Sequence, residues 1–106
     1  MDWIQIFSTS AEARNKVPVG KPRLLQVGSI RICLGNVDNA LFAIEDKCSH
    51  NGESLSKGTI NFLGEIICPW HGYRFKLNTG REVGQRSRDL ITYQIRENEN
   101  GVYLYI

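Results

Sequence analysis

The sequence predicts an all-β protein, a single domain of antiparallel strands arranged as a sandwich or barrel. Short segments with alternating apolar and polar residues recur along the chain, and they are rich in β-branched and aromatic residues. Turns containing glycine, asparagine and aspartate separate them. A chain of 106 residues can enclose one core, so we expect a single domain over residues 1–106.

The strands can be assigned in order. The first covers Trp3–Phe7, and the polar segment 8–23 that follows contains two prolines and a glycine. We therefore expect at most one helical turn there, followed by a loop. A turn is expected at residues 35–39. The other predicted strands, all with apolar patterning, are Leu24–Val27, Ser29–Leu34, Ala40–Glu45, Thr59–Leu63, Glu65–Cys68, Tyr73–Leu77, Leu90–Arg96 and Val102–Ile106.

The composition narrows the class of protein. A formal net charge of +2 gives no strongly basic surface for nucleic acid. No stretch reaches the roughly 18 apolar residues needed to cross a bilayer, and the N-terminus lacks a basic leader. We therefore expect a soluble, cytoplasmic protein without a membrane partner. Three cysteines are an odd number, which favours metal ligands or buried thiols over a disulfide framework.

Both histidines of the chain follow a cysteine closely, as Cys48-Ser49-His50 and Cys68-Pro69-Trp70-His71. The 17 residues between His50 and Cys68 are predicted to form a loop and a hairpin, which can bring the two pairs together at one end of a sheet. These four side chains are the candidate metal ligands. Cys33, by contrast, has no histidine near it, and we interpret it as a buried apolar residue opposite the face of Ile30, Ile32 and Leu34.

Two kinds of metal site remain possible from the ligand types. A structural zinc site is the first, but zinc modules usually pair like ligands, with C-x2-4-C followed by H-x3-5-H. Here each loop contributes one thiolate and one imidazole. A two-iron cluster suits such mixed loops, because each loop can send its cysteine to one iron and its histidine to the other.

The segments CSHNGESL (48–55) and CPWHGYRF (68–75) resemble the cluster-binding loops of Rieske-type [2Fe-2S] proteins, with the patterns C-x-H-x-G-x-x-L and C-P-x-H-G-x-x-F. The flanking strands are similar to those of soluble Rieske ferredoxins. The resemblance implies a Rieske-like antiparallel β-sandwich or barrel with a small inserted cluster-binding subdomain at about residues 47–75. It also implies one [2Fe-2S] cluster per chain, with four ligands: Cys48, His50, Cys68 and His71.

Other loop positions fit this family. Gly52 and Gly72 follow the histidines, where a side chain would obstruct a tight loop. Leu55 and Phe75 are expected to shield the cluster from water. A third loop, residues 84–89, lacks the prolines common in these ferredoxins. Its two arginines either offer positive charge to an acidic partner or are simply solvated.

Departures from the family pattern predict a low reduction potential. Rieske subunits of cytochrome bc-type complexes carry an additional, disulfide-bonded cysteine in each loop, where this chain has Glu53 and Trp70. They also carry a serine and a tyrosine that donate hydrogen bonds, where this chain has Tyr73 and Phe75. Loss of donors destabilises the reduced, more negative cluster and lowers its potential.

The function predicted from these features is that of a soluble one-electron carrier rather than an enzyme. The resemblance implies a flavin-dependent reductase as donor and a terminal oxygenase or other oxidoreductase as acceptor. Both histidines are assigned to the cluster, so no 2-His-1-carboxylate iron site for oxygen chemistry can form. The alternative is a non-catalytic small subunit of a larger oxidoreductase, similar to that of assimilatory nitrite reductase.

Overall fold

The computed structural model describes all 106 residues and consists of three antiparallel sheets, one α-helix and one 3₁₀-helix. The first sheet has the order β1-β10-β9, with bounds Trp3–Phe7, Gly101–Tyr105 and Ile95–Asn98. The second has the order β2-β3-β4-β8, with bounds Arg23–Val27, Ile30–Val37, Ala40–Glu45 and Thr92–Tyr93. The third has the order β5-β6-β7, with bounds Thr59–Ile60, Glu65–Ile67 and Arg74–Lys76. The all-β antiparallel prediction is confirmed, but no sheet closes into a barrel.

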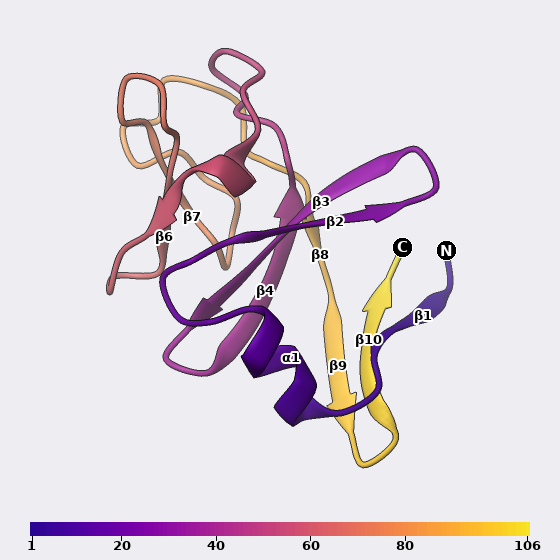
Figure 1. Cartoon of the computed structure of the whole chain (residues 1–106). Helices are drawn as coiled ribbons and strands as arrows, with labels where there is room; N and C mark the ends of the chain where they lie inside the picture. The colour runs from indigo at the N-terminus through magenta and orange to yellow at the C-terminus, as the bar shows by residue number, and fades with distance from the viewer.

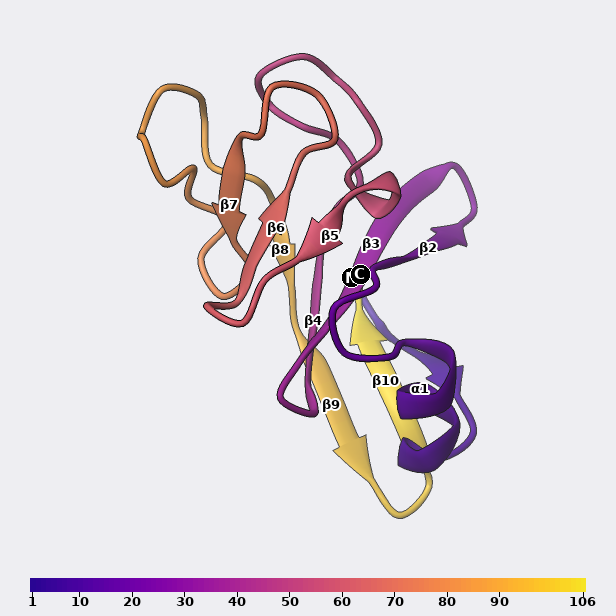
Figure 2. The same ribbon diagram turned by 60° about the vertical axis from the view of Figure 1, so that its left-hand side comes forward.

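Strand β3 lies in the middle of the molecule and is covered on both faces. Ile32 and Leu34 point into one hydrophobic cluster, which also contains residues of α1, β1 and β10. Cys33, between them, points into the other, which contains residues of the third sheet. Figures 1 and 2 show the third sheet and its loops at one end, with α1, β9 and β10 at the other. The interpretation of Cys33 as a buried apolar residue is confirmed, and burial raises the pKa of its thiol.

The helix α1 (Ser10–Lys16) is longer than the single turn that we expected, so that prediction was wrong. Thr9 caps the helix by accepting a hydrogen bond from the backbone N–H of Glu12 at 2.9 Å. Glu12 in turn accepts from the backbone N–H of Ser8 at 2.9 Å. A threonine followed three residues later by glutamate is a helix-start pattern; here the glutamate accepts from the residue before the cap rather than from the cap itself. The signal was present in the sequence, but the nearby prolines outweighed it in our interpretation.

The predicted strand Leu90–Arg96 is divided between β8 of the second sheet and β9 of the first, and the ends of β3 and β5 were misplaced. Strand β3 continues through residues 35–37, which pair with residues 40–42 of β4. The turn is limited to Asp38 and Asn39, both with positive φ, a geometry that suits a two-residue hairpin. Strand β5 is shorter than predicted because Asn61 starts a turn, in which its side-chain oxygen accepts from the N–H groups of Leu63 and Glu65.

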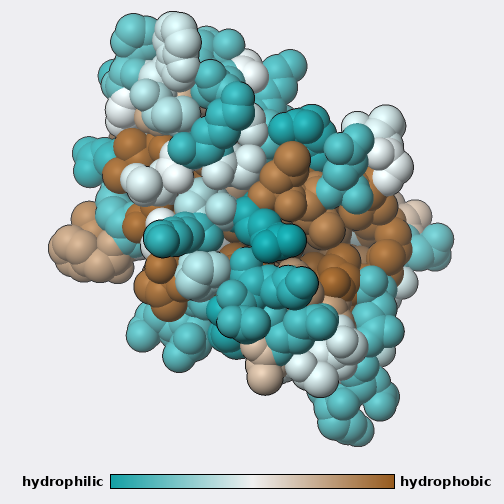
Figure 3. Space-filling view, in the orientation of Figure 1, coloured by the Kyte–Doolittle hydropathy of each residue, from teal (hydrophilic) through white to brown (hydrophobic).

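Three loops gather at the end of the molecule that carries the third sheet (Figures 1 and 2). The first, residues 46–54, follows β4, and the second, residues 68–73, follows β6. The third, residues 84–89, belongs to the connection between β7 and β8. Figure 3 shows this end as mostly hydrophilic surface, whereas the largest hydrophobic area lies between the β2–β3 hairpin and the two termini. No helix of the structure has the length and apolar character to cross a membrane.

The third loop is built around Glu82, whose side chain is fully buried. Its carboxylate accepts hydrogen bonds from the backbone N–H groups of Gly84 at 2.6 Å and Arg86 at 2.7 Å. It also binds the Arg86 guanidinium through two hydrogen bonds of 3.1 Å. The hydrogen bonds from Arg86 are the main cause that lowers the pKa of Glu82 to about 2, although burial opposes the shift. An ionised Glu82 therefore holds the loop in shape.

A substitution at Gly58 tests the packing of the third sheet. This residue ends the 3₁₀-helix Leu55–Lys57, and a Cβ atom there would lie 2.0 Å from the carbonyl oxygen of Ile67. Because backbone atoms must move to relieve that overlap, Gly58→Ala should lower the free energy of unfolding by about 1–3 kcal/mol. Urea denaturation followed by circular dichroism measures the loss. The neighbouring exposed substitution Lys57→Ala is the control, with an expected change within about 0.5 kcal/mol. Equal stability of Gly58→Ala and wild type would contradict the packing.

The pH dependence of stability tests the role of Glu82. The folded-state pKa of about 2 lies below the ordinary value of 4.5, so the carboxylate stabilises the fold fully above the ordinary value. That contribution is lost as the pH falls from about 4.5 toward 2. Glu82→Gln should therefore be less stable than wild type at neutral pH, and the difference should shrink across this window. Urea midpoints of both proteins between pH 7 and pH 2 measure it, and a difference independent of pH would refute the ionised anchor.

Candidate cluster-binding site

The first and second loops close in the same way, although their sequences differ. The backbone N–H of Cys48 donates to the carbonyl of Glu53 at 2.8 Å, and that of Cys68 donates to the carbonyl of Tyr73 at 2.8 Å. Each cysteine thus bonds to the residue five positions later. A glycine precedes each acceptor, with φ of 80° at Gly52 and 68° at Gly72. Both loops are therefore tight turns that start at a cysteine and include a histidine.

The backbone conformation of the two loops gives a reason for the two glycines. A Cβ at Gly72 would meet no protein atom within 4 Å, and one at Gly52 would only touch the end of the Lys47 side chain at 3.8 Å. Crowding by the protein therefore does not demand glycine. The positive φ at both positions favours glycine, because this backbone conformation is costly for residues with a Cβ. His71 also has positive φ, at 67°, so the second loop contains two consecutive residues in this conformation.

The two cysteines of the loops lie at their bases, inside the protein. Cys48 and Cys68 are both buried, and they share a hydrophobic cluster with Leu55 and Phe75, which are fully buried. Burial, followed by the neighbouring Cys48, raises the pKa of the Cys68 thiol. All the cysteines of the chain are unpaired. The expectation that Leu55 and Phe75 shield this position from water is consistent with their burial.

The two histidines lie on the outside of the same site. His50 and His71 are both exposed, and their ring centroids are 5.7 Å apart, with one ring edge-on to the other. The loops therefore divide their four candidate ligands by depth, with the thiols inside and the imidazoles at the surface. Trp70 lies beside His71, with 56% of its surface exposed.

The donor set fits a two-iron cluster better than a single ion. The structure groups the predicted residues as a pair of neighbouring thiols and a pair of neighbouring imidazoles. No three His, Cys, Asp or Glu side chains are grouped closely enough to hold one metal ion, as a tetrahedral zinc site would require. Two pairs of unlike ligands match a [2Fe-2S] cluster with cysteine on one iron and histidine on the other. When bound, such a cluster supplies a one-electron redox centre.

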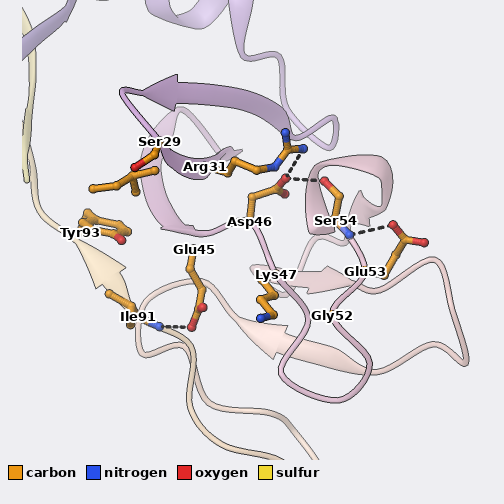
Figure 4. Close-up of a pocket in the computed structure, with 11 residues that line it drawn as sticks. Ser29, Arg31, Glu45, Asp46, Lys47, Gly52, Glu53, Ser54, Ile91 and Tyr93 are labelled. Atoms are coloured by element: carbon orange, nitrogen blue, oxygen red, sulfur yellow. Dashed lines mark hydrogen bonds and ion pairs between the residues drawn. The ribbon is translucent and has the colours of Figure 1, made fainter.

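A buried carboxylate that our sequence analysis missed anchors the first loop. Asp46 accepts hydrogen bonds from the hydroxyl of Ser54 and from the backbone N–H of Ser56, the latter at 2.6 Å. It also pairs with Arg31 at 3.3 Å, so it ties β3 to both ends of the loop. Figure 4 shows the contacts of Asp46 with Arg31 and Ser54, which line an open pocket. Nothing in the local sequence pattern marks Asp46, because its partners lie eight or more residues away.

The third loop is tied to the first loop and to β4. The Ser49 hydroxyl donates to the carbonyl of Arg88 at 2.7 Å. The Arg88 guanidinium binds Glu45 through hydrogen bonds of 2.6 and 3.1 Å. Burial tends to raise the pKa of Glu45, but the bonds from Arg88 and from the N–H of Ile91 outweigh it, so the pKa is lowered. Both arginines of the third loop, Arg86 and Arg88, therefore have carboxylate partners and are not simply solvated charges.

Tyr73 connects the second loop to the other two. Its ring stacks on the His50 ring with a centroid distance of 3.8 Å and an interplanar angle of 11°. The Arg86 guanidinium carbon lies 3.7 Å from the centroid of the same tyrosine ring. The His50 ring and the Arg86 guanidinium would overlap if both lay on the same face of the Tyr73 ring, so they occupy opposite faces. The sequence predicted only that Tyr73 differs from the serine of high-potential relatives, because a stack between three loops leaves no local pattern.

Comparison with known proteins agrees with this geometry. Residues 8–94 match the family model described as the Rieske [2Fe-2S] domain. The 3-phenylpropionate/cinnamic acid dioxygenase ferredoxin subunit of Photorhabdus laumondii is 32% identical over 103 residues, which cover 96% of this chain and 94% of that protein. The protein of the same name from Escherichia coli strain K12 is 30% identical over 89 residues, which cover 83% of each chain.

Solved structures give the same result. A chain in the complex of reduced oxygenase and oxidized ferredoxin in carbazole 1,9a-dioxygenase superposes with a TM-score of 0.80 at 26% identity, covering 96% of this chain and 100% of that one. The ferredoxin of carbazole 1,9a-dioxygenase from Nocardioides aromaticivorans shares the fold, with a TM-score of 0.81 at 20% identity over 98% of this chain and 97% of that one. Together with the paired thiols and imidazoles, these matches confirm the resemblance seen in the two loops: the chain belongs to the Rieske [2Fe-2S] domain family.

Proposed function

We propose that this protein is a one-electron carrier that takes electrons from a flavin-dependent reductase and passes them to an oxygenase. The observation that carries the proposal is the division of the site by depth, with a buried thiol pair beneath an exposed imidazole pair. Membership of the Rieske family supports the cofactor, one [2Fe-2S] cluster per chain. Relatives named as dioxygenase ferredoxin subunits support the role of an electron-transfer component rather than a catalytic enzyme.

Within this proposal the ligands are assigned residue by residue. Cys48 and Cys68 hold the inner iron, and His50 and His71 hold the outer iron. The cluster-binding subdomain extends over about residues 47–75, within a single domain of residues 1–106. Its hydrophobic cluster includes Cys33 and other residues of the central sheet, so the subdomain rests on the rest of the fold.

The chain's own residues then determine how electrons enter and leave. The burial of Leu55 and Phe75 keeps water away from the thiol side of the site. The imidazoles face solvent, so a partner can approach the histidine side closely. The exposed ring of Trp70, next to His71, adds apolar surface at this approach. The loop end therefore offers one accessible side for electron exchange.

The named relatives support the choice of electron acceptor, and the unpaired cysteines support the choice of cellular compartment. An oxygenase is favoured over a nitrite reductase as acceptor, because the similar proteins are named for dioxygenases and one similar chain is in a complex described as oxygenase and ferredoxin. All cysteines are unpaired, as expected in the reducing cytoplasm, where we propose that the protein works.

Cluster loading tests the ligand assignment. The purified protein should be red-brown, hold two irons per chain and show the EPR signal of a reduced Rieske centre. Cys48→Ser and Cys68→Ser should each lose the cluster, because a thiolate ligand is removed. Cys33→Ala is the matched control and should keep full iron content, since this buried cysteine takes no part in ligation. A colourless, zinc-loaded wild-type protein would refute the assignment.

The reduction potential tests the comparison with high-potential relatives. Phe75 cannot donate a hydrogen bond, and the Tyr73 ring is stacked on His50. The potential should therefore fall in the lower half of the range of roughly −150 to +300 mV that Rieske centres span. Protein-film voltammetry measures it directly. A value near the top of that range would refute the argument from the missing donors.

A further inference from the structure

The geometry points to a positioning role for Tyr73, which no sequence pattern assigns: we propose that Tyr73, held from behind by Arg86, sets the orientation of the His50 imidazole. This inference rests on the proposed ligation of a cluster by His50. It concerns a stack of three side chains, each from a different loop. His50 comes from the first loop, Tyr73 from the second and Arg86 from the third.

The first step is that no hydrogen bond from another residue holds the His50 ring. The imidazoles that ligate metals usually donate their second ring N–H to a carboxylate, a carbonyl or a water, and this hydrogen bond fixes the ring orientation. No hydrogen bond between the His50 ring and another residue occurs in the structure, and the residue is exposed. Its one close contact with a definite plane is Tyr73, at 3.8 Å and 11°. Among the contacts that the chain itself supplies, this stack is therefore the one that fixes the plane of the ring.

The second step is that Tyr73 is itself held on its other face. The Arg86 guanidinium lies 3.7 Å from the ring centroid, within the range of a cation–π contact. A free arginine side chain would sample many rotamers, but this one is bound through two hydrogen bonds of 3.1 Å to the fully buried Glu82. The restraint thus runs from a buried carboxylate to Arg86, then to Tyr73 and finally to His50.

The third step is that the two histidines are held differently. His71 has no stacked partner; its aromatic neighbours, His50 and Trp70, lie edge-on at 5.7 and 6.1 Å. His71 instead lies in the tight turn of the second loop, with positive φ. A change at Tyr73 should therefore affect one imidazole and leave the other in place. This asymmetry gives the inference a spectroscopic signature.

Two substitutions at Tyr73 test the stack in the loaded protein. Tyr73→Phe keeps the ring and should match wild type, whereas Tyr73→Leu removes it. Pulsed EPR of the reduced protein resolves the coupling of each imidazole nitrogen to the cluster, and Tyr73→Leu should shift one of the two couplings. Loss of iron to a chelator should also be about 10-fold faster, as is typical when a group that orients a metal ligand is removed. Unchanged couplings and unchanged iron loss in Tyr73→Leu would overturn the inference.

The arginines of the third loop provide a matched pair of variants. Arg86→Gln should shift the same nitrogen coupling as Tyr73→Leu, and the double variant should show no further shift, because both changes act through one contact. Arg88→Gln breaks the other arginine–carboxylate pair of the loop without touching Tyr73, so it should leave both couplings unchanged. Equal shifts of the nitrogen couplings in the two arginine variants would indicate a general effect of loop stability. That result would refute the positioning role of Tyr73.

The outcomes separate this inference from the proposed function. A wild-type protein without the two imidazole couplings would refute cluster ligation by His50 and His71, and the positioning role would fall with it. A wild-type protein with both couplings, in which Tyr73→Leu and Arg86→Gln leave them unchanged, would keep the proposed function and refute the positioning role alone. Both substituted side chains are partly or largely solvent-exposed, so neither change opens a cavity in the core.

Discussion

The site depends on one repeated interaction, the hydrogen bond from a cysteine N–H to the carbonyl five residues later. It closes the first loop between Cys48 and Glu53 and the second between Cys68 and Tyr73, each at 2.8 Å. Because the closure is the same, both loops turn their cysteine inward and their histidine outward. Together the two loops therefore place a pair of cysteines inside the protein and a pair of histidines at its surface, which neither loop could do alone. The proposed binding of a two-iron cluster, with cysteines on one iron and histidines on the other, depends on this geometry.

A buried carboxylate fastens the first loop to the rest of the fold, and another shapes the third loop. Asp46 ties the first loop to β3 and to the 3₁₀-helix, and Glu82 shapes the third loop. A buried charge is tolerated only when it is paired and hydrogen-bonded, and both carboxylates meet that condition. Their arginine partners and hydrogen bonds thus offset the electrostatic cost of burying the two carboxylates, at the places where the loops need rigid ends. Strand β3, covered on both faces, supplies the base beneath them.

Arginine and aromatic residues join the loops across the top of the site. The stack of Arg86, Tyr73 and His50 brings one side chain from each loop into a single column. A positive guanidinium on an aromatic face is favourable, and its pairing with Glu82 leaves little net charge beside the site. Electrostatic attraction of a partner by Arg86 and Arg88 is therefore weakened, since both guanidinium groups are already paired. Through these pairs both arginines hold the third loop in place.

Local patterns in the sequence predicted the features that depend on near neighbours. Alternating apolar residues predicted the strands at Trp3–Phe7 and Ala40–Glu45 at their observed ends, since strand formation follows a two-residue period. The helix α1 was underestimated because prolines after it were weighed above its capping pattern at Thr9 and Glu12. The end of β3 was misplaced because Gly35 and Asn36 resemble turn residues, whereas tertiary pairing with β4 keeps them in the strand. In both cases a competing local signal was outweighed by hydrogen bonds.

By itself the sequence determined the family and the four candidate ligands, because cysteine and histidine at those spacings occur in few other contexts and their chemistry is specific. It also determined that no disulfide can brace the two loops, since the required cysteines are absent. The tertiary structure alone decided the depth of each candidate ligand, the carboxylate partners of Arg86 and Arg88, and the stacking of Tyr73 on His50. These contacts join residues from separate loops, and no period or motif encodes a distance between segments that meet only after the chain has folded.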